Sequence, residues 1–280
     1  QPANTISFTL AAVKHPPVLD LNGAGAGNNH SASYTEDGAP VAIAVPTASV
    51  TDIDSTTMQS GRFVIANGSS GDVLSIAGTL PAGITAAYDP ATFTLTLSGT
   101  ASSAAYATAV AQIRYATTSD TPATTARTIN GTVTDASGLS SAVATTTVSV
   151  TAFNDAIANT SRDFVVAEDG TLLLSGLSVS DPDAATGTVS VTLSVPAGAG
   201  TISATSGANV TVANSGTNSI TLSGTVADIN AYLANAATQP VFRQAVGDFN
   251  GTIELTMSSN DNGNSGSGGA LADTDTRTIT

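Results

Sequence analysis

Two closely spaced pairs of carboxylates stand where turns are expected. Asp52 and Asp54 follow an apolar stretch, and Asp181 and Asp183 follow another. In an extended chain alternate side chains leave the same face, so both carboxylates of a pair can share one cation. Ca²⁺ takes about six to eight oxygen ligands from carboxylates, Asn side chains, backbone carbonyls and water. Each pair by itself also fits a simple turn, because Asp, Asn and Gly favour turns. Their recurrence in matching places favours calcium binding.

An internal repeat organises these residues. Each half of the chain has an acidic dipeptide before glycine, an Asp-x-Asp pair, a Thr-Leu-Ser-Gly-Thr run and a late acidic loop, in that order. The landmarks are Glu36-Asp37-Gly38, Asp52/Asp54, Leu95–Thr100 and Asp135 in the first copy, and Glu168-Asp169-Gly170, Asp181/Asp183, Ile220–Thr225 and Asp261 in the second. The copies are about 130 residues apart, which indicates a tandem of whole domains rather than a solenoid of small units.

The same landmarks predict the domain boundaries. Residues 16–153 form the first domain and residues 154–280 the second, with Phe153-Asn154-Asp155 at the junction. Residues 1–15 are interpreted as the last strand of a preceding repeat, as a linker, or as a donor strand, because Asn4–Leu10 alternates apolar and polar residues. The chain is therefore expected to be an excerpt from a longer array.

Short alternating runs separated by Gly, Asn, Asp and Ser predict an all-β fold. About seven such strands per copy favour two tandem Greek-key β-sandwiches of the cadherin or immunoglobulin type. The alanine-rich stretches 101–113 and 226–237 are the candidates for helix, so one short helix or helical turn is expected in each domain. The glycine-rich run Asn262–Gly269 lacks the regular spacing of a calcium-binding β-roll and is predicted to be a long mobile loop.

Composition excludes several classes of function. Seven Lys and Arg face 21 Asp and Glu, which gives a net charge of −14. So few basic residues cannot neutralise a nucleic-acid backbone, and an anionic membrane surface would repel the chain. With no cysteine, the chain has neither disulfides nor thiolate chemistry. Charged residues make up only 10% of the chain, so Ser, Thr, Asn and Gly must keep the surface hydrated.

Enzymatic activity is not expected. The carboxylates recur equivalently in both copies, which suits a structural role better than a single glycosidase active site. His15 and His30 have no counterparts in the second copy and belong to no recognisable catalytic motif.

Together these motifs resemble the cadherin-like repeats of giant bacterial surface adhesins. The resemblance rests on a Glu near the end of the first strand, the Asp-x-Asp pair, the late Asp and the Asn-Asp linker, and it covers nearly the whole chain. Such repeats often end in an Asn-Asp-Ala-Pro linker; here the linker is Asn154-Asp155-Ala156-Ile157, with Ile in place of Pro. The resemblance implies Ca²⁺ at domain junctions, where it stiffens the array, and an extracellular place on the bacterial cell surface.

The resemblance also implies three groups of ligands. An inter-domain calcium cluster would comprise Glu36, Asp37, Asp120, Asn154, Asp155, Asp181, Asp183 and Asp261. A weaker site toward a preceding repeat would use Asp52, Asp54 and Asp135, because His15-Pro16-Pro17 stands where Asn-Asp is expected. An incomplete site for a following repeat would use Glu168, Asp169 and Asp248.

The function expected from the resemblance is a calcium-stiffened spacer or stalk of a large adhesin, active in adhesion or biofilm formation. Its partners would be neighbouring repeats of the same or an identical chain. Two alternatives remain open. One is a subunit of an extracellular fibre that assembles by strand addition through Asn4–Leu10. The other is a module that binds a glycan or protein of the host or cell surface.

Overall fold

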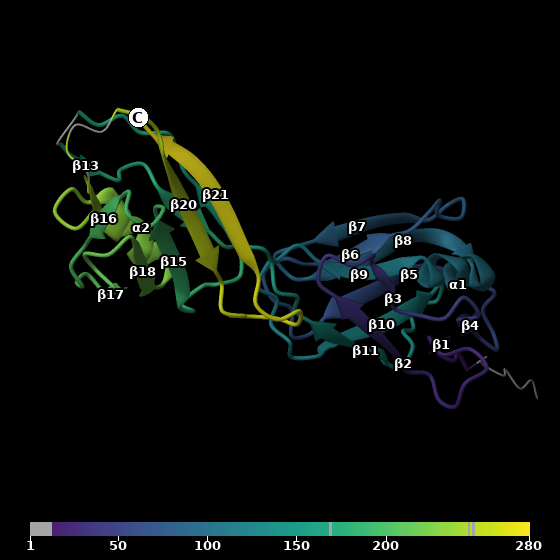
Figure 1. The fold of residues 1–280 in the computed structure, drawn as a ribbon. Coiled ribbons are helices and arrows are strands. Elements are labelled where there is room, and N and C mark those ends of the chain that lie inside the picture. The colour runs from purple at the N-terminus through teal and green to yellow at the C-terminus, as the bar shows by residue number, and fades with distance from the viewer. Residues whose placement is uncertain (1–12, 168–169, 246, 248–249) are drawn as a thin grey trace, which may run out of the picture. The chain divides into compact units, whose positions relative to one another are not determined.

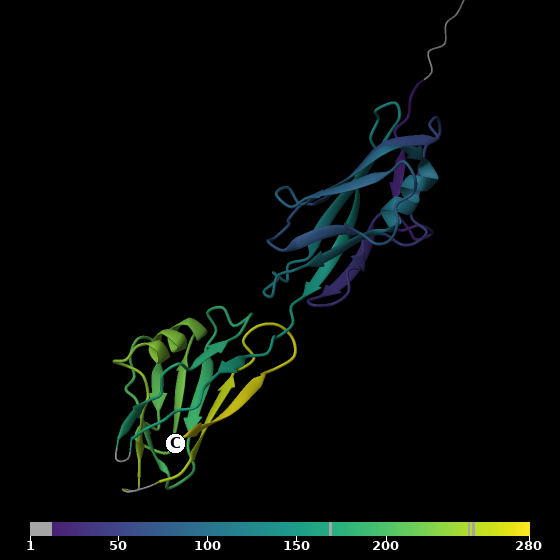
Figure 2. The same ribbon diagram turned by 90° about the horizontal axis from the view of Figure 1, so that it is seen from above.

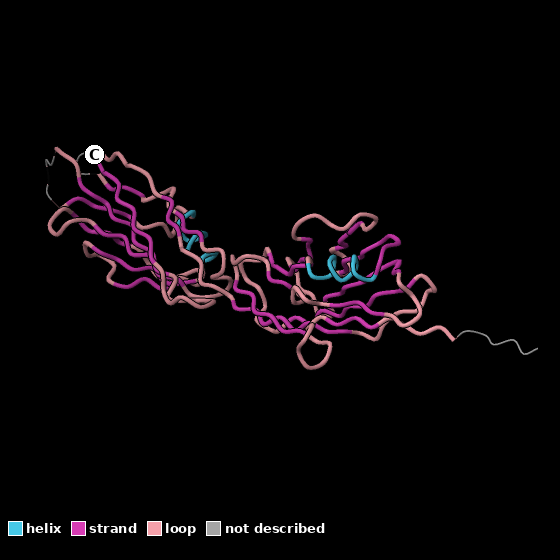
Figure 3. Tube along the Cα trace, turned by 90° about the vertical axis from the view of Figure 1, so that its right-hand side faces the viewer, coloured by secondary structure: helices cyan, strands magenta, loops and turns pink. Residues whose placement is uncertain are grey.

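The chain forms two compact units, Gln1–Thr151 and Ala152–Thr280, which Figure 1 shows. This computed structural model describes residues 13–167, 170–245, 247 and 250–280. Its described part is built mainly of strands, with one short helix in each unit (Figure 3). The expected all-β class with one helix per domain is confirmed. No helix in the described part of the chain is both long and apolar enough to cross a membrane.

The first domain is a sandwich of a large and a small sheet. The large sheet has the strand order β2-β11-β10-β5-β8-β7, the small one has the order β3-β9-β6, and β1 pairs with β4. The strands are β1 Val18–Asp20, β2 His30–Thr35, β3 Val41–Ala42, β4 Ser49–Thr51, β5 Thr57–Ile65, β6 Asp72–Ile76, β7 Thr85–Asp89, β8 Thr94–Ser102, β9 Ile113–Thr117, β10 Arg127–Asp135 and β11 Ala144–Thr151. Helix α1, Ser103–Ala111, connects the large sheet to the small one.

The second domain repeats this plan. Its large sheet has the order β17-β18-β15-β20-β21, its small sheet has the order β13-β19-β16, and β12 pairs with β14. The strands are β12 Ala158–Thr160, β13 Thr171–Leu173, β14 Ser178–Ser180, β15 Val189–Ser194, β16 Gly200–Ser203, β17 Thr211–Ala213, β18 Ser219–Gly224, β19 Val241–Gln244, β20 Ile253–Asn260 and β21 Ala272–Ile279. Helix α2, Val226–Ala234, again follows the strand with the Leu-Ser-Gly sequence.

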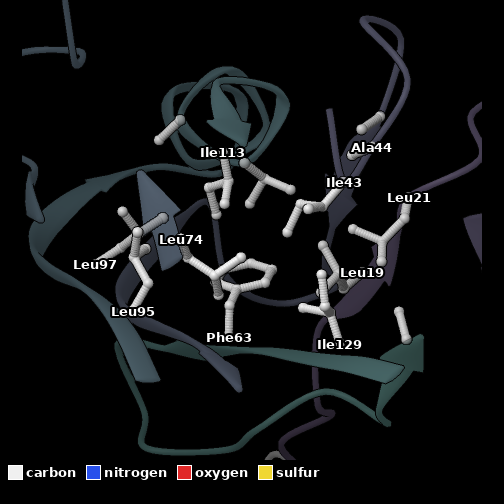
Figure 4. Packing of buried hydrophobic residues seen from close by; sticks show 14 of the residues in the cluster. Leu19, Leu21, Ile43, Ala44, Phe63, Leu74, Leu95, Leu97, Ile113 and Ile129 are labelled. Atoms are coloured by element: carbon white, nitrogen blue, oxygen red, sulfur yellow. The ribbon is translucent and has the colours of Figure 1, made fainter. Parts of the chain in front are cut away.

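Strand alternation produces the core of each domain. Along β10, Ile129 and Val133 are buried, whereas Thr128 and Thr132 on the opposite face are only partly covered. The inward side chains of both sheets meet in one apolar cluster, where Phe63 lies among Leu74, Ile113 and Ile129 (Figure 4). The second domain has a separate cluster of its own. Two separate cores follow from two copies of one pattern.

The helices begin at capping residues that the repeat shares. Ser102 Oγ accepts the N–H of Ala105 at 3.1 Å, and Thr225 Oγ1 accepts the N–H of Asp228 at the same distance. Such caps satisfy backbone donors that the first turn leaves unpaired. Helix α1 occupies the interior of the predicted stretch 101–113, because β8 runs to Ser102 and β9 begins at Ile113. The helix predictions are therefore confirmed, with shorter limits.

Hydroxyl groups replace charge on the outer face of the large sheet in the second domain. Thr192 lies opposite Thr221 on one neighbouring strand and Ser258 on the other, and Ser258 lies opposite Thr274. The Thr192 and Thr221 hydroxyls are 3.1 Å apart, and those of Ser258 and Thr274 are 3.0 Å apart. This face agrees with the expectation that Ser and Thr hydrate the surface of a chain with few charges.

A buried ion pair distinguishes the first domain. Arg127 Nε donates to Asp72 Oδ2 at 2.6 Å, and both residues are buried. Tyr115 Oη donates to the other oxygen, Asp72 Oδ1, at 2.7 Å, and the Ser69 N–H donates to Oδ2 at 2.7 Å. Burial and the neighbouring Asp72 carboxylate raise the pKa of Tyr115. These contacts join β6, β9 and β10 through one carboxylate.

Candidate metal centres

Three carboxylates converge at one end of the first domain. Asp52 and Asp54 follow β4, and Asp135 is the last residue of β10. One oxygen of each lies within 4.8 Å of the others, which makes them the one such group of three among the residues that the structure describes. This group of three carboxylates thus lies where the sequence predicts the weaker site.

Asp52 is held by a turn that leaves one oxygen available. Its Oδ1 accepts the N–H groups of Asp54 and Ser55, at 3.0 and 3.1 Å. Its Oδ2 is buried and has no hydrogen-bond partner. A buried carboxylate oxygen without a donor is costly, so this atom is a candidate ligand for a cation.

Asp135 is the buried member of the group. Ser137 Oγ donates to both of its oxygens, at 2.9 and 2.8 Å, and the Leu139 N–H donates to Oδ1 at 2.8 Å. Burial by itself would raise the pKa of Asp135, but these hydrogen bonds outweigh it and hold that pKa below its usual range. Asp135 is therefore kept as an anion.

His15 contacts the third carboxylate of this group. The His15 N–H donates to Asp54 Oδ2 at 3.0 Å, and its ring Nδ1 lies 3.3 Å from the same oxygen. Burial opposes ionisation of Asp54, but the bonds from His15 and the nearby charge of Lys14 lower its pKa overall. A cationic side chain and a histidine therefore share this site with the three carboxylates.

The Asp-x-Asp pair of the second domain has the same geometry. Asp181 Oδ1 accepts the N–H groups of Asp183 and Ala184, at 3.2 and 3.0 Å, and Asp181 Oδ2 is buried without a partner. Asp183 Oδ2 accepts the Asp155 N–H at 3.2 Å, whereas Asp183 Oδ1 is also buried without a partner. The two Asp-x-Asp pairs thus form the same turn, and in each the first Asp has a buried Oδ2 without a hydrogen-bond partner.

The pKa of Asp181 is raised by its buried position next to Asp183. Burial, followed by the hydrogen bond and charge of Asp183, raises the pKa of Asp181 to about 6. A like charge nearby disfavours ionisation, whereas a bound cation would favour it. The pair is therefore electrostatically unfavourable at neutral pH unless a cation is present.

Asn154 and Asp261 complete this end of the second domain. Asn154 Nδ2 donates to Asp261 Oδ2 at 2.6 Å, and both residues are buried. The N–H groups of Gly263 and Leu271 each donate to Asp261 Oδ1 at 2.8 Å. Burial would raise the pKa of Asp261, but these donors lower it overall. Asn154 Oδ1 is buried without a partner and adds a third unused oxygen.

The segment between β20 and β21, yellow in Figure 2, is a long loop, as the sequence predicts, and it contacts the start of the second domain. The Asn154 N–H donates to Ser267 O at 2.8 Å, and the Ser267 N–H donates to Ala152 O at 2.9 Å. Ser265 Oγ donates to the backbone oxygen of Asp183 at 2.7 Å. Gly266 permits this close approach, because a Cβ there would lie 2.3 Å from the carbonyl carbon of Phe153. These contacts pack the loop against the start of the second domain, and its mobility stays a prediction.

Other predicted ligands lie in the first domain or outside the described residues. Glu36 is buried just beyond β2, and its N–H donates to Thr151 O at 3.0 Å. Asp37 and Asp120 are exposed. That these three meet the second-domain ligands stays a prediction. The remaining predicted ligands, Glu168, Asp169 and Asp248, lie outside the described residues.

Some contributors were missed at the sequence level. Ser137 donates a hydrogen bond to Asp135, and Ser265 donates one to Asp183. The charge of Lys14 lowers the pKa of Asp54. Lys14 precedes His15 as Asn154 precedes Asp155. An alignment of the two copies would therefore have placed Lys14 at the first-domain site. Isolated serines give no comparable signal in a chain rich in Ser.

The donor atoms fit a hard divalent cation. Asn154, Asp181 and Asp183 of the second domain each have one buried side-chain oxygen without a hydrogen-bond partner. Oxygen-only ligands with more than one carboxylate are typical of Ca²⁺, whereas Zn²⁺ and other transition metals favour sites with nitrogen or sulfur. These residues would hold the ion, whose charge would offset the repulsion within the Asp-x-Asp pair.

The strand order establishes the class of each domain, a Greek-key β-sandwich of the cadherin and immunoglobulin type. No protein-family model and no curated protein sequence matches the chain. Among solved structures it is similar to human mucin-like protocadherin EC1-2, with 11% identity, coverage of 96% of this chain and 98% of that one, and a TM-score of 0.34.

Two further structures are also similar. Mouse cadherin-23 EC22-24 has 10% identity, with 94% of this chain and 66% of that one covered and a TM-score of 0.31. The titin domains z1z2 have 13% identity, 96% and 97% coverage and a TM-score of 0.28. The sandwich class rests on the strand pairing described above, and these likenesses add no detail of function.

Proposed function

We propose that this chain is a calcium-binding pair of structural repeats from the stalk of a large extracellular adhesin on a bacterial surface. Its role is to space and stiffen, and adhesion or biofilm contact is made elsewhere in the parent protein. We also propose that the chain has no catalytic activity. The acidic groups recur at matching positions in both domains, whereas an active site would be a single, unrepeated group of residues.

One observation supports the proposal most strongly. Asp52 and Asp181 adopt the same turn in separate domains, and each retains a buried Oδ2 without a donor. Two domains with separate cores have the same electrostatically costly arrangement. A shared ligand explains this better than turn formation, because the turn uses only Oδ1 of each residue.

The role in stiffening follows from where the candidate ligands lie in the sequence. Asn154 and Asp155 are the first polar residues after the last strand of the first domain, and Asp155 donates its N–H to Asp183. An ion held by Asn154, Asp181 and Asp183 would fix the start of the second domain. The flexibility of the connection would then depend on the ion.

Calorimetry of the whole chain tests the proposal. Millimolar Ca²⁺ is expected to raise the unfolding temperature of the second domain above its value in EDTA, since a ligand of the folded state stabilises it by mass action. Mg²⁺ at the same concentration is the control, because its smaller octahedral shell suits this ligand set less well. Identical transitions in Ca²⁺ and EDTA would contradict the calcium role.

A further inference from the structure

Strand β7 presents a regular, unpaired edge at one side of the first domain's large sheet. All five of its residues pair with β8 in register, from Thr85 opposite Ser98 to Asp89 opposite Thr94, without a bulge. Within the described part of the chain no strand pairs with its other side (Figure 1). A free strand edge offers a row of backbone donors and acceptors to another strand.

The second domain interrupts the same edge. The counterpart of β7 is β17, which pairs with β18 over only three residues, Thr211–Ala213. Left-handed backbone conformations lie on both sides of it, at Asn209 (φ 62°) and Asn214 (φ 58°). Short, interrupted edge strands are a common protection against edge-to-edge pairing. One domain therefore has this protection, and the other keeps a longer regular edge.

The β7 sequence also lacks chemical protection. Thr85–Asp89 contains no Lys, Arg or Pro, which often block sheet edges, and Ala86 and Ala87 are exposed at its centre. The single charge is Asp89 at the end. In a chain of net charge −14, an uncharged centre is where two copies can approach with least repulsion.

Two copies of β7 can pair with each other as antiparallel strands. A two-fold axis through Ala87 places Ala86 opposite Tyr88 and Thr85 opposite Asp89. The two Asp89 carboxylates then lie at opposite ends of the contact instead of facing each other, which avoids the cost of like charges directly across a ladder. A two-fold contact requires a self-complementary patch, and this register provides one.

An apolar hollow lies beside this edge. It has a volume of about 560 Å³ and is lined in part by Tyr88, Pro90, Phe93 and Val73. Tyr88 is fixed there, because its Oη donates to the backbone oxygen of Asp72 at 2.7 Å. Pairing of two β7 strands would bring the uncharged centre of a second β7 near this hollow and add burial to the new backbone hydrogen bonds.

We propose that β7 is a self-association edge through which two copies of this chain join their first domains, forming one continuous sheet by antiparallel β7–β7 pairing. This interaction goes beyond the stalk function and is independent of calcium. It would link neighbouring stalks laterally, and a contact of five residues per strand is expected to be weak and reversible.

Sedimentation equilibrium of the full chain over a range of concentrations tests the proposal. The native chain is expected to show a reversible monomer–dimer equilibrium. Ala87→Lys and Ala87→Glu should each weaken the dimer at least tenfold, because the two-fold axis sets identical charges against each other. An equimolar mixture of the two variants should recover the dimer as a heterodimer, which also shows that both variants are folded.

Ala213→Lys, at an exposed residue of the interrupted strand β17 that pairs with Thr221 as Ala87 pairs with Thr96, is the matched control and should leave the equilibrium unchanged. The proposal is overturned if the native chain stays monomeric up to millimolar concentration, or if Ala87→Lys dimerises as the native chain does. It is also overturned if Ala213→Lys abolishes the dimer. Loss of the dimer only on removal of residues 1–12 would instead assign the contact to strand addition by that segment.

Discussion

The backbone N–H of His15 donates to Asp54 Oδ2 at 3.0 Å, just as the N–H of Asp155 donates to Asp183 Oδ2 at 3.2 Å in the other domain. The chain therefore reaches the Asp-x-Asp pair in the same way in both copies. Only the side chains differ: the first domain has Lys14 and His15 where the second has Asn154 and Asp155. The residues of the second domain at these two positions can therefore be tested by substitution in the first domain.

Exchange of two residues should strengthen the calcium site of the first domain. Lys14→Asn with His15→Asp removes a cation and adds two oxygen-bearing side chains beside Asp52, Asp54 and Asp135. Affinity for Ca²⁺ depends on the number and charge of oxygen ligands, so it is expected to rise about tenfold or more. Isothermal titration with Ca²⁺ measures the change. The same exchange in an Asp52→Ala background should give no gain; a gain there would mean that the new side chains bind calcium elsewhere.

Asp181→Asn should have opposite effects with and without calcium. In EDTA at pH 7 it relieves repulsion from Asp183 and should raise the unfolding temperature of the second domain. In millimolar Ca²⁺ it removes a charged ligand and should lower affinity by about tenfold or more. Calorimetry in both conditions measures the two effects. Asp52→Asn, the equivalent change in the first domain, should leave the second-domain transition unmoved. A loss of stability in EDTA would show that Asp181 only maintains the turn.

The raised pKa of Asp181 predicts a pH dependence of the metal-free protein. Its pKa of about 6 in the folded state exceeds the ordinary value of about 3.9 expected when unfolded. The folded state therefore binds the proton more tightly, so this contribution to stability is complete below about pH 4 and is lost as the pH rises through about 6. In EDTA, the native chain should lose more second-domain stability between pH 4 and 7 than Asp181→Asn. Parallel pH profiles for the two proteins would contradict the assignment.

The buried pair in the first domain predicts a large, local loss of stability. Arg127→Met leaves the Asp72 carboxylate buried without its cation, which is expected to cost about 3–5 kcal/mol. Tyr115→Phe removes one hydrogen bond to the same carboxylate and should cost about 2 kcal/mol. Urea unfolding, with the transition of each domain followed separately, measures these changes in the free energy of unfolding. Arg62→Met, at an exposed arginine of the same domain, is the control and should stay within about 0.5 kcal/mol of the native chain. Equal effects of Arg127→Met and Arg62→Met would show that the pair contributes no special stability.

Gly266→Ala should disturb the candidate metal centre from a distance in sequence. The new Cβ would lie 2.3 Å from the Phe153 carbonyl carbon, at a residue with φ of 88°. The loop must move, and Asn154 loses the hydrogen bond that its N–H donates to Ser267 O, so both second-domain stability and its response to Ca²⁺ should fall. Gly198→Ala is the matched control: its φ is 84°, but no atom lies within 4 Å, so only the backbone penalty of about 1–2 kcal/mol remains. If the two variants respond alike to Ca²⁺, the loop does not support the site.

Local sequence patterns were sufficient to predict the elements. Short alternating runs between turn residues indicated strands, and the alanine-rich stretches after each Leu-Ser-Gly run indicated α1 and α2. The caps Ser102 and Thr225 lie at matching positions because the repeat preserves them. These features depend on neighbours a few residues apart, and such interactions are visible in sequence.

The ion pair of Asp72 and Arg127 had no such signal, because 55 residues separate its partners and the second copy has no equivalent. The packing of the glycine-rich loop against Phe153 had no such signal either: composition indicates where glycine permits motion, but it does not indicate that another segment packs against the loop. Both features require a fold that brings distant segments together.

By itself, the sequence determined the tandem repeat, the β-sandwich class, and the identity and order of the acidic residues. Tertiary structure alone decided which carboxylate oxygens remain unused. Asp52, Asp135, Asp181 and Asp261 are all acidic residues of the same motifs, yet hydrogen bonds occupy both oxygens of Asp135 and Asp261 and leave one oxygen on each of the others. The physical reason is that a carboxylate is satisfied by whatever donors the fold places within about 3 Å of it, and those donors come from residues far away in the chain.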